Sequence, residues 1–103
     1  MTETNYYYDE KNIIEKISLE NVTICVVKGN KNDENDNVYC FDSNMKVIWR
    51  IKQAPVNIGG TMKSSYVGID YTDGKCRVID FWGRRFWVNI NTGEIYGRDI
   101  VKL

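Results

Sequence analysis

The stretch FWGRRFWV, residues 81–88, places four aromatic side chains and two arginines around a single glycine. A two-residue hairpin loop with glycine at its first central position is typical of a type II′ turn. Gly83 and Arg84 fit that loop, which predicts a hairpin with Phe81 opposite Phe86. The side of the sheet on which each neighbouring residue lies depends on this turn, because a shift of one residue exchanges the two faces of a strand.

The stretch YTDGK, directly upstream, predicts the preceding turn. Thr72, Asp73 and Gly74 suit a three-residue loop whose glycine adopts the left-handed conformation. That loop sets Val67 opposite Ile79. Together the two turns predict a core face of apolar residues on three neighbouring strands: Val67, Ile69, Ile79, Phe81, Phe86, Val88 and Ile90.

The same registers bring Tyr66, Asp80 and Trp87 together on the opposite face, with Trp82 and Arg85 beside them. Trp, Tyr and Arg are enriched at binding hot spots, which favours an exposed recognition surface. A second layer of sheet that covers this face is the other interpretation. A buried Asp80 would then need hydrogen bonds from Tyr66 or Trp87. The covering side chains would include Val47, Trp49 and Tyr96.

Short runs of β-branched and aromatic residues, separated by Gly, Asn and Asp, recur along the whole chain. This pattern predicts an all-β fold, an antiparallel meander of about seven or eight strands. The expected strands lie at about 13–18, 21–28, 37–42, 46–52, 64–71, 75–82, 85–90 and 94–101.

The longest break in the pattern, QAPVNIGGTMKS, contains the only proline and a Gly-Gly pair. It predicts a single domain, 1–103, with two β-meander halves, about 12–53 and 63–103, joined by a loop at 54–62. YCFDSNMKVIW from Tyr39 resembles FWVNINTGEIY from Phe86, either by chance or as a repeat like a propeller blade. Two blade-like halves cannot close a ring, so we expect a curved sheet or a small sandwich.

Several chemistries are excluded by composition. The absence of histidine removes Ser-His and Cys-His nucleophile pairs and imidazole metal sites. Asp70 and Asp80 would lie roughly 13 Å apart along the predicted strands, too far for a glycosidase pair. Cys25, Cys40 and Cys76 form no C-x-x-C pair and fit small buried hydrophobes. We therefore expect a protein that is not an enzyme and has no metal and no cofactor.

Charge and hydropathy bear on location and partners. Lys plus Arg (14) balance Asp plus Glu (14), so no bulk field draws the chain to nucleic acid or to an anionic membrane. No signal peptide and no stretch of ~20 apolar residues is evident, which predicts a soluble, cytoplasmic protein without a membrane partner. The run KCRVIDFWGRRFWVNI interleaves cations with aromatics, so single-stranded nucleic-acid binding stays as an alternative.

Two stretches carry a family resemblance. NVYCFDSNMKVIWRI resembles the hairpin of pyrroloquinoline-quinone-type propeller repeats, and YVGIDYTDGKCRVIDFWGRRFWVNINTGEIYGRDIVK resembles a group of small uncharacterised bacterial β-proteins. Some of these bacterial proteins are encoded beside polymorphic-toxin genes and are regarded as immunity proteins. No quinone cofactor is implied, because that cofactor lies on the axis of a complete propeller.

The resemblance implies a non-catalytic protein-binding module that neutralises a cytoplasmic toxin domain. A structural protein that self-associates as a homodimer, and the single-stranded nucleic-acid binder, are the alternatives. Acidic residues would meet a basic toxin site, and aromatic and basic residues would anchor the complex. The candidate binding residues are Glu20, Asp33, Glu34, Asp36, Tyr66, Asp80, Trp82, Arg84, Arg85 and Trp87.

Overall fold

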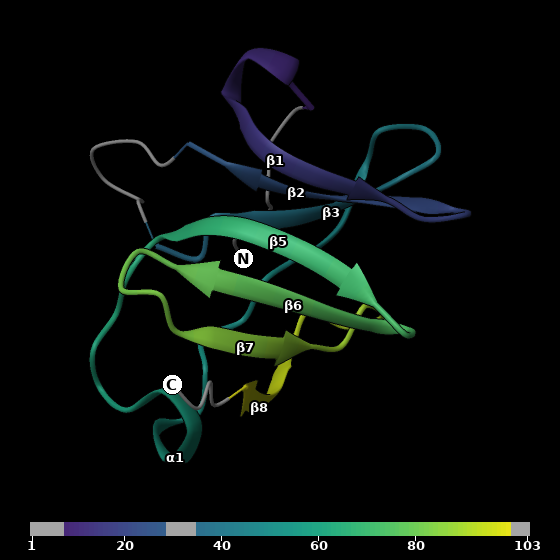
Figure 1. Ribbon diagram of the computed structural model, residues 1–103. Coiled ribbons are helices and arrows are strands. Elements are labelled where there is room, and N and C mark those ends of the chain that lie inside the picture. Colours follow the sequence, from purple (N-terminus) through teal and green to yellow (C-terminus); the bar gives the residue numbers. More distant parts are fainter. Residues whose placement is uncertain (1–7, 29–34, 100–103) are drawn as a thin grey trace, which may run out of the picture.

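The structure is a computed structural model that describes residues 8–28 and 35–99. Within these residues, eight strands form two four-stranded antiparallel sheets (Figure 1), which confirms the predicted all-β fold. Each sheet is a meander, because its strands pair in chain order. The first sheet contains β1 (Ile13–Ser18), β2 (Val22–Val27), β3 (Val38–Asp42) and β4 (Val47–Arg50). The second contains β5 (Tyr66–Thr72), β6 (Lys75–Asp80), β7 (Arg85–Val88) and β8 (Ile95–Asp99).

Two short helical turns accompany the strands. A 3-10 turn, η1 (Glu10–Asn12), precedes β1, and its first residues are capped by the carboxylate of Asp9. The segment between the sheets, expected as a loop at 54–62, contains one helical turn, α1 (Val56–Gly59). Pro55 stands directly before α1, where its missing N–H costs nothing.

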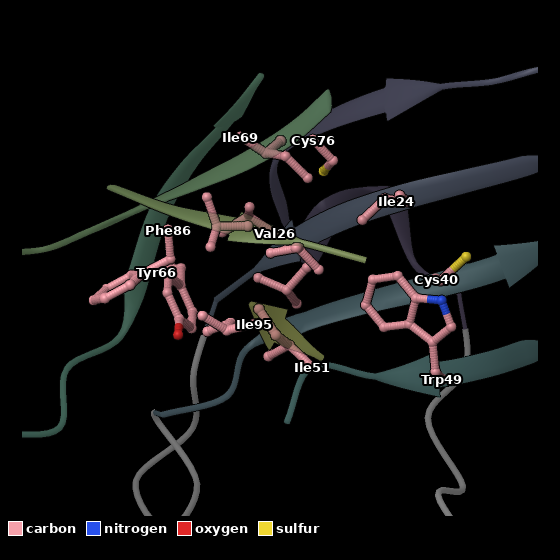
Figure 2. Packing of buried hydrophobic residues seen from close by; sticks show 13 residues of the cluster. Ile24, Val26, Cys40, Trp49, Ile51, Tyr66, Ile69, Cys76, Phe86 and Ile95 are labelled. Carbon is pink, nitrogen blue, oxygen red and sulfur yellow. The ribbon is translucent and has the colours of Figure 1, made fainter. Parts of the chain in front are cut away.

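The main core lies between the two sheets, and β5 packs beside β1 and β2. Figure 2 shows side chains from both sheets pointing into this shared space. All three cysteines are buried and free, as the sequence predicts, and two of them lie in this core. Its buried members are Ile24, Val26, Val38, Cys40, Trp49, Ile51, Tyr66, Ile69, Cys76, Val78, Phe86, Val88 and Ile95.

Polar side chains also join the sheets. The amide of the buried Asn37 donates to the carbonyls of Val27 (2.7 Å) and Tyr66 (2.8 Å) and accepts from the Tyr66 N–H (2.7 Å). The Glu15 carboxylate of β1 accepts from the Ile69 N–H of β5 at 2.7 Å. These hydrogen bonds satisfy the buried amide of Asn37 and the Ile69 N–H where the two sheets meet.

The first sheet has a second apolar cluster on its outer face. Cys25, Val27, Tyr39 and Phe41 are all buried there. Tyr8 packs its ring edge-on against Phe41, with ring centroids 5.2 Å apart. Strands β2 and β3 are therefore buried on both faces, which explains why their sequences read as nearly continuous apolar runs.

The predicted turn after β6 is wrong. The loop has three residues, 81–83, because the Asp80 N–H donates to the Arg84 carbonyl at 2.9 Å. Gly83 is its third residue, in the left-handed region at φ 82°. The register between β6 and β7 therefore differs from the predicted register by an odd number of residues. As a result Val78, not Phe81, lies on the same face as Phe86.

The predicted turn before β6 is also wrong. Thr72 pairs with Lys75, so only Asp73 and Gly74 form the loop, at φ 53° and 78°, the positive values of a type I′ turn. As a consequence Gly68, instead of Val67, lies opposite Ile79. Of the predicted core face, Ile69, Phe86 and Val88 are buried and Ile90 packs against the core, whereas Val67 and Phe81 are exposed and Ile79 lies on the opposite face.

The two stretches that resemble each other form the last hairpin of each sheet. Asp42 and Asn89 begin the two loops, and each side chain accepts from a backbone N–H two residues later at 2.8 Å. The second loop is one residue longer, since Asn89 pairs with Glu94 whereas Asp42 pairs with Lys46. The similarity therefore ends at the loop, and Trp49 is buried while its predicted counterpart Tyr96 is exposed.

Candidate functional site

The loop that joins β6 to β7, residues 80–84, presents two large aromatic side chains to solvent; we call it the aromatic turn. Phe81 is 66% exposed and Trp82 is 62% exposed. Their rings contact each other edge to face, with centroids 5.4 Å apart and planes at 89°. Two neighbouring aromatics this exposed form an apolar protrusion, which differs from the single exposed apolar residues found on any protein surface.

A buried carboxylate holds the aromatic turn from inside. Asp80 is 1% exposed, and its Oδ1 accepts from the N–H groups of Trp82 (3.0 Å) and Arg84 (2.8 Å). Its Oδ2 accepts from Nε of Arg84 at 2.7 Å. A buried charge is tolerated only when it is paired and hydrogen-bonded, and Asp80 meets both conditions.

The side chain of Arg84 fixes the turn to the segment around α1. Its Nη1 donates to the Gly59 carbonyl at 2.7 Å and its Nη2 to the Met62 carbonyl at 3.1 Å. The guanidinium also lies 5.2 Å from the centre of the Phe86 ring. On the other side of the turn, the Phe81 N–H donates to the Ser65 carbonyl at 2.9 Å. The backbone below the two exposed aromatics is therefore fixed from both sides.

A cavity beside Arg84 is too small for a substrate. It has a volume of about 30 Å³ and is lined by Tyr66, Asp80, Arg84 and neighbours from the α1 segment. Sites for small organic ligands have volumes of roughly 300–1,000 Å³. The buried polar cluster of the aromatic turn is thus a support for the loop.

The outer face of the second sheet carries a network of ion pairs. Arg77 forms a bidentate pair with Asp70 (3.1 and 2.6 Å) and a second pair with Asp99. These two carboxylates raise the pKa of Arg77. Lys75 and Arg77 also lie over the Trp87 ring, 5.5 and 5.6 Å from its centre. The carboxylates of Asp70 and Asp99 thus offset part of the positive charge that Lys75, Arg77 and Arg85 bring to this face.

The structure separates the predicted site residues. Tyr66 and Asp80 lie opposite each other and are buried, whereas Trp87 lies on the ion-pair face, so the predicted surface of these three residues does not exist. The odd register shifts on both sides of β6 turn Asp80 toward the core, and a bulge between Tyr66 and Gly68 does the same for Tyr66. Asp80 takes its hydrogen bonds from the aromatic turn and not from Tyr66 or Trp87.

The other predicted residues fall in different places. Trp82 is exposed, Arg84 supports the turn from inside, and Arg85 lies 4.0 Å from Asp99 on the ion-pair face. Glu20 is exposed in the β1–β2 loop, at the opposite end of the molecule from the aromatic turn (Figure 1). Asp36 lies near the small cavity, and Asp33 and Glu34 lie outside the described residues.

Sequence reasoning missed Phe81 as an exposed residue, and with it the nearby Met62 and Lys63. Met62 accepts a hydrogen bond from the turn, and Lys63 is exposed beside it. A local signal for Phe81 was present, because Asp80 followed by glycine three residues later fits an Asp-capped loop with a left-handed third residue. No local signal marks Met62, whose position depends on a contact across 22 residues of sequence.

The described residues hold no group of three or more His, Cys, Asp or Glu placed to bind a metal ion. Burial raises the pKa of Cys25 and Cys40 to about 11 and that of Cys76 to about 12, so these thiols stay protonated near neutral pH. No helix in the described part of the chain is long and apolar enough to cross a membrane.

A family model described as "Domain of unknown function (DUF7957)" matches residues 4–100 of the chain. No curated protein and no solved structure gives a significant match.

Proposed function

The chain belongs to the domain family DUF7957, and we propose that it is a non-catalytic protein-binding domain that contacts its partner through the aromatic turn. One observation carries the proposal: Phe81 and Trp82 are exposed on a loop whose backbone is fixed by the buried pair Asp80 and Arg84. Nothing in the fold of the described residues requires aromatic side chains at these two positions.

The energetics support this assignment. Fully burying a large apolar side chain contributes about 1.5–3 kcal/mol, so a partner that covers both rings gains several kcal/mol. Binding hot spots contribute at least about 2 kcal/mol each and are enriched in tryptophan. Because the loop is already fixed by hydrogen bonds, little backbone entropy is lost when it binds, and preorganisation of this kind increases affinity.

The finer proposal concerns the partner. The resemblance of residues 66–102 to bacterial proteins regarded as immunity proteins supports a toxin domain as the partner, which the complex neutralises. A cytoplasmic location of both proteins is part of this proposal. The pairing of Arg77 with Asp70 and Asp99 reduces the positive charge of the ion-pair face, which supports protein over single-stranded nucleic acid as the ligand.

The experiment compares three forms of the tagged chain as bait in a lysate of the source organism. These are the unaltered chain, a turn variant with Phe81→Ser and Trp82→Ser, and a control with Ile14→Ser and Ile48→Ser. The control residues are exposed apolar side chains on other strands. Unfolding curves first establish that all three forms are folded.

We expect one polypeptide to be retained by the unaltered chain and the control, with at least tenfold less on the turn variant. Capture by all three forms equally, or by none, would overturn the proposal. Once the retained polypeptide is purified, the finer proposal requires that its expression stops growth of host cells. Co-expression of the unaltered chain, but not of the turn variant, should restore that growth.

A further inference from the structure

Tyr66, the first residue of β5, has a buried side chain whose hydroxyl is not paired. The residue is only 6% exposed. Its backbone N–H and carbonyl both bond to the Asn37 amide, but its hydroxyl has no hydrogen-bond partner among residues 8–28 and 35–99. Buried polar groups in folded proteins are nearly always hydrogen-bonded, either to protein or to ordered water, so this hydroxyl calls for an explanation.

The hydroxyl of Tyr66 stays protonated near neutral pH. Burial raises the pKa of Tyr66, and the negative charges of Asp36 and Asp80 raise this pKa further. A protonated phenol can both donate and accept a hydrogen bond. Without any partner it would destabilise the fold, because it gives up its hydrogen bonds to bulk water and gains none in return.

The small cavity beside Arg84 reaches this side chain. It has a volume of about 30 Å³, and Tyr66, Asp80 and Arg84 all line it. A cavity needs at least about 10–15 Å³ to hold a water molecule, so this one has room for one or two waters. Its size therefore selects water over any larger ligand.

The other polar groups that line the cavity have hydrogen-bonding capacity left. Each terminal nitrogen of Arg84 carries two hydrogens, and within the described residues each donates one bond, Nη1 to the Gly59 carbonyl and Nη2 to the Met62 carbonyl. Oδ2 of Asp80 accepts from Nε of Arg84 and can accept once more. Buried waters typically make about three hydrogen bonds, and water can donate and accept, so it suits this mixed set together with Tyr66.

The charges around the cavity favour a neutral occupant. Lys63 and Arg84 line it with positive charge, and Asp36 and Asp80 line it with negative charge. Asp80 and Arg84 are also paired with each other at 2.7 Å. An anion or a metal ion would meet no excess of opposite charge there to offset its loss of hydration. Water carries no net charge and has no such requirement.

We infer that the small cavity holds an ordered water molecule that hydrogen-bonds to the Tyr66 hydroxyl and links it to the Asp80–Arg84 pair. This water adds β5 to the elements that support the aromatic turn from inside. The inference does not depend on what the turn binds, because it concerns the interior of the molecule.

Urea unfolding of Tyr66→Phe tests whether the hydroxyl is hydrogen-bonded. Removing a bonded hydroxyl should lower the folding equilibrium constant about 2–10-fold, whereas removing an unpaired one should leave the constant unchanged or raise it. Tyr96→Phe is the matched control, since it removes a phenol hydroxyl from a residue that is 55% exposed, and should change the constant less than about twofold. A Tyr66→Phe variant at least as stable as the unaltered chain would overturn the inference.

A high-resolution crystal structure of the unaltered chain locates the water directly. We expect one water oxygen about 2.5–3.0 Å from the Tyr66 hydroxyl and within hydrogen-bond distance of Asp80 or Arg84. Electron density that shows no water in contact with the hydroxyl would overturn the inference. A water that contacts Tyr66 alone would overturn the link to the aromatic turn.

Discussion

The aromatic turn, residues 80–84, and the loop joining β3 to β4, residues 42–46, have the same backbone design and different surfaces. Each begins with an aspartate whose Oδ1 accepts from N–H groups two and four residues later. Each has its fourth residue in the left-handed region, Gly83 at φ 82° and Met45 at φ 63°. We call the second loop the polar turn, because its tip consists of Ser43 and Asn44.

The difference between the two turns lies in what surrounds the aspartate. Asp42 is only partly buried and Lys46 is exposed, whereas Asp80 is buried and pairs with Arg84, whose side chain is 13% exposed. The polar turn shows that this backbone forms without tip aromatics and without a buried cation. The backbone pattern therefore does not by itself require Phe81, Trp82 or Arg84, and each of these residues can be tested against its counterpart in the polar turn.

The largest difference is expected at the aspartates. Asp80→Ala should lower the free energy of unfolding by about 3 kcal/mol, because it leaves the largely covered Arg84 charge without its partner. Asp42→Ala should cost about 1 kcal/mol, since it removes only hydrogen bonds at an accessible loop. Urea unfolding measures both values, and equal losses would contradict the assigned roles. Should Asp80→Ala not fold, Asp80→Asn provides the comparison.

A smaller difference is expected at the cations. Arg84→Lys should lower the free energy of unfolding by about 1.5–3 kcal/mol, because an ammonium cannot reach Asp80 and both carbonyl acceptors in one geometry. Lys46→Arg should change it by less than about 0.5 kcal/mol, as is usual for exposed positions. A Lys46 variant as damaging as the Arg84 variant would show that the two turns are supported alike.

The left-handed positions should respond in opposite directions. Gly83→Ala should be destabilising by about 1–2 kcal/mol, because a side chain at this φ is strained. Met45→Gly relieves that strain and should be stabilising by up to about 1 kcal/mol. The sign of the Met45 change in thermal or urea unfolding is the decisive measurement, and a loss of stability there would contradict the shared backbone design.

The smallest effect on stability is expected at the tips. Replacing both Phe81 and Trp82 by serine should change the free energy of unfolding by less than about 0.5 kcal/mol, since both side chains are mostly exposed. Grafting the pair onto the polar turn, with Ser43→Phe and Asn44→Trp, should be equally mild. If the graft alone, in a chain lacking Phe81 and Trp82, restores capture of a partner, binding requires only exposed aromatics and not this site.

The strands could be predicted from the sequence because their signal is local. Runs such as TICVV and VYCF are rich in β-branched and aromatic residues and are separated by turn residues, and all eight strands lie near their expected ranges. This local pattern does not predict how neighbouring strands are aligned. Gly74 and Gly83 mark where each turn occurs, but loops of two and of three residues both place a glycine in the left-handed region.

Contacts with residues far away in the sequence determine whether the loop has two or three residues. The three-residue loop at Phe81 lets Asp80 reach Arg84, which in turn contacts the Gly59 carbonyl 25 residues away. No pattern within residues 81–88 reveals that contact. Trp82 was correctly placed among exposed candidates, whereas Asp80 was assigned to the wrong face because odd shifts on both sides of β6 reverse that strand alone, and Tyr66 because a bulge separates it from Gly68.

The amide of Asn37 has a consequence for how the chain can be divided. Its hydrogen bonds span both sheets, so neither half can satisfy this buried group alone. A cut at the exposed residues 55–57 would yield two fragments, each lacking the apolar surface that covers its half of the core. We expect such fragments to fold only when they associate. The domain is therefore suited to fragment complementation, in which formation of the core between the two sheets reports that the fragments have assembled.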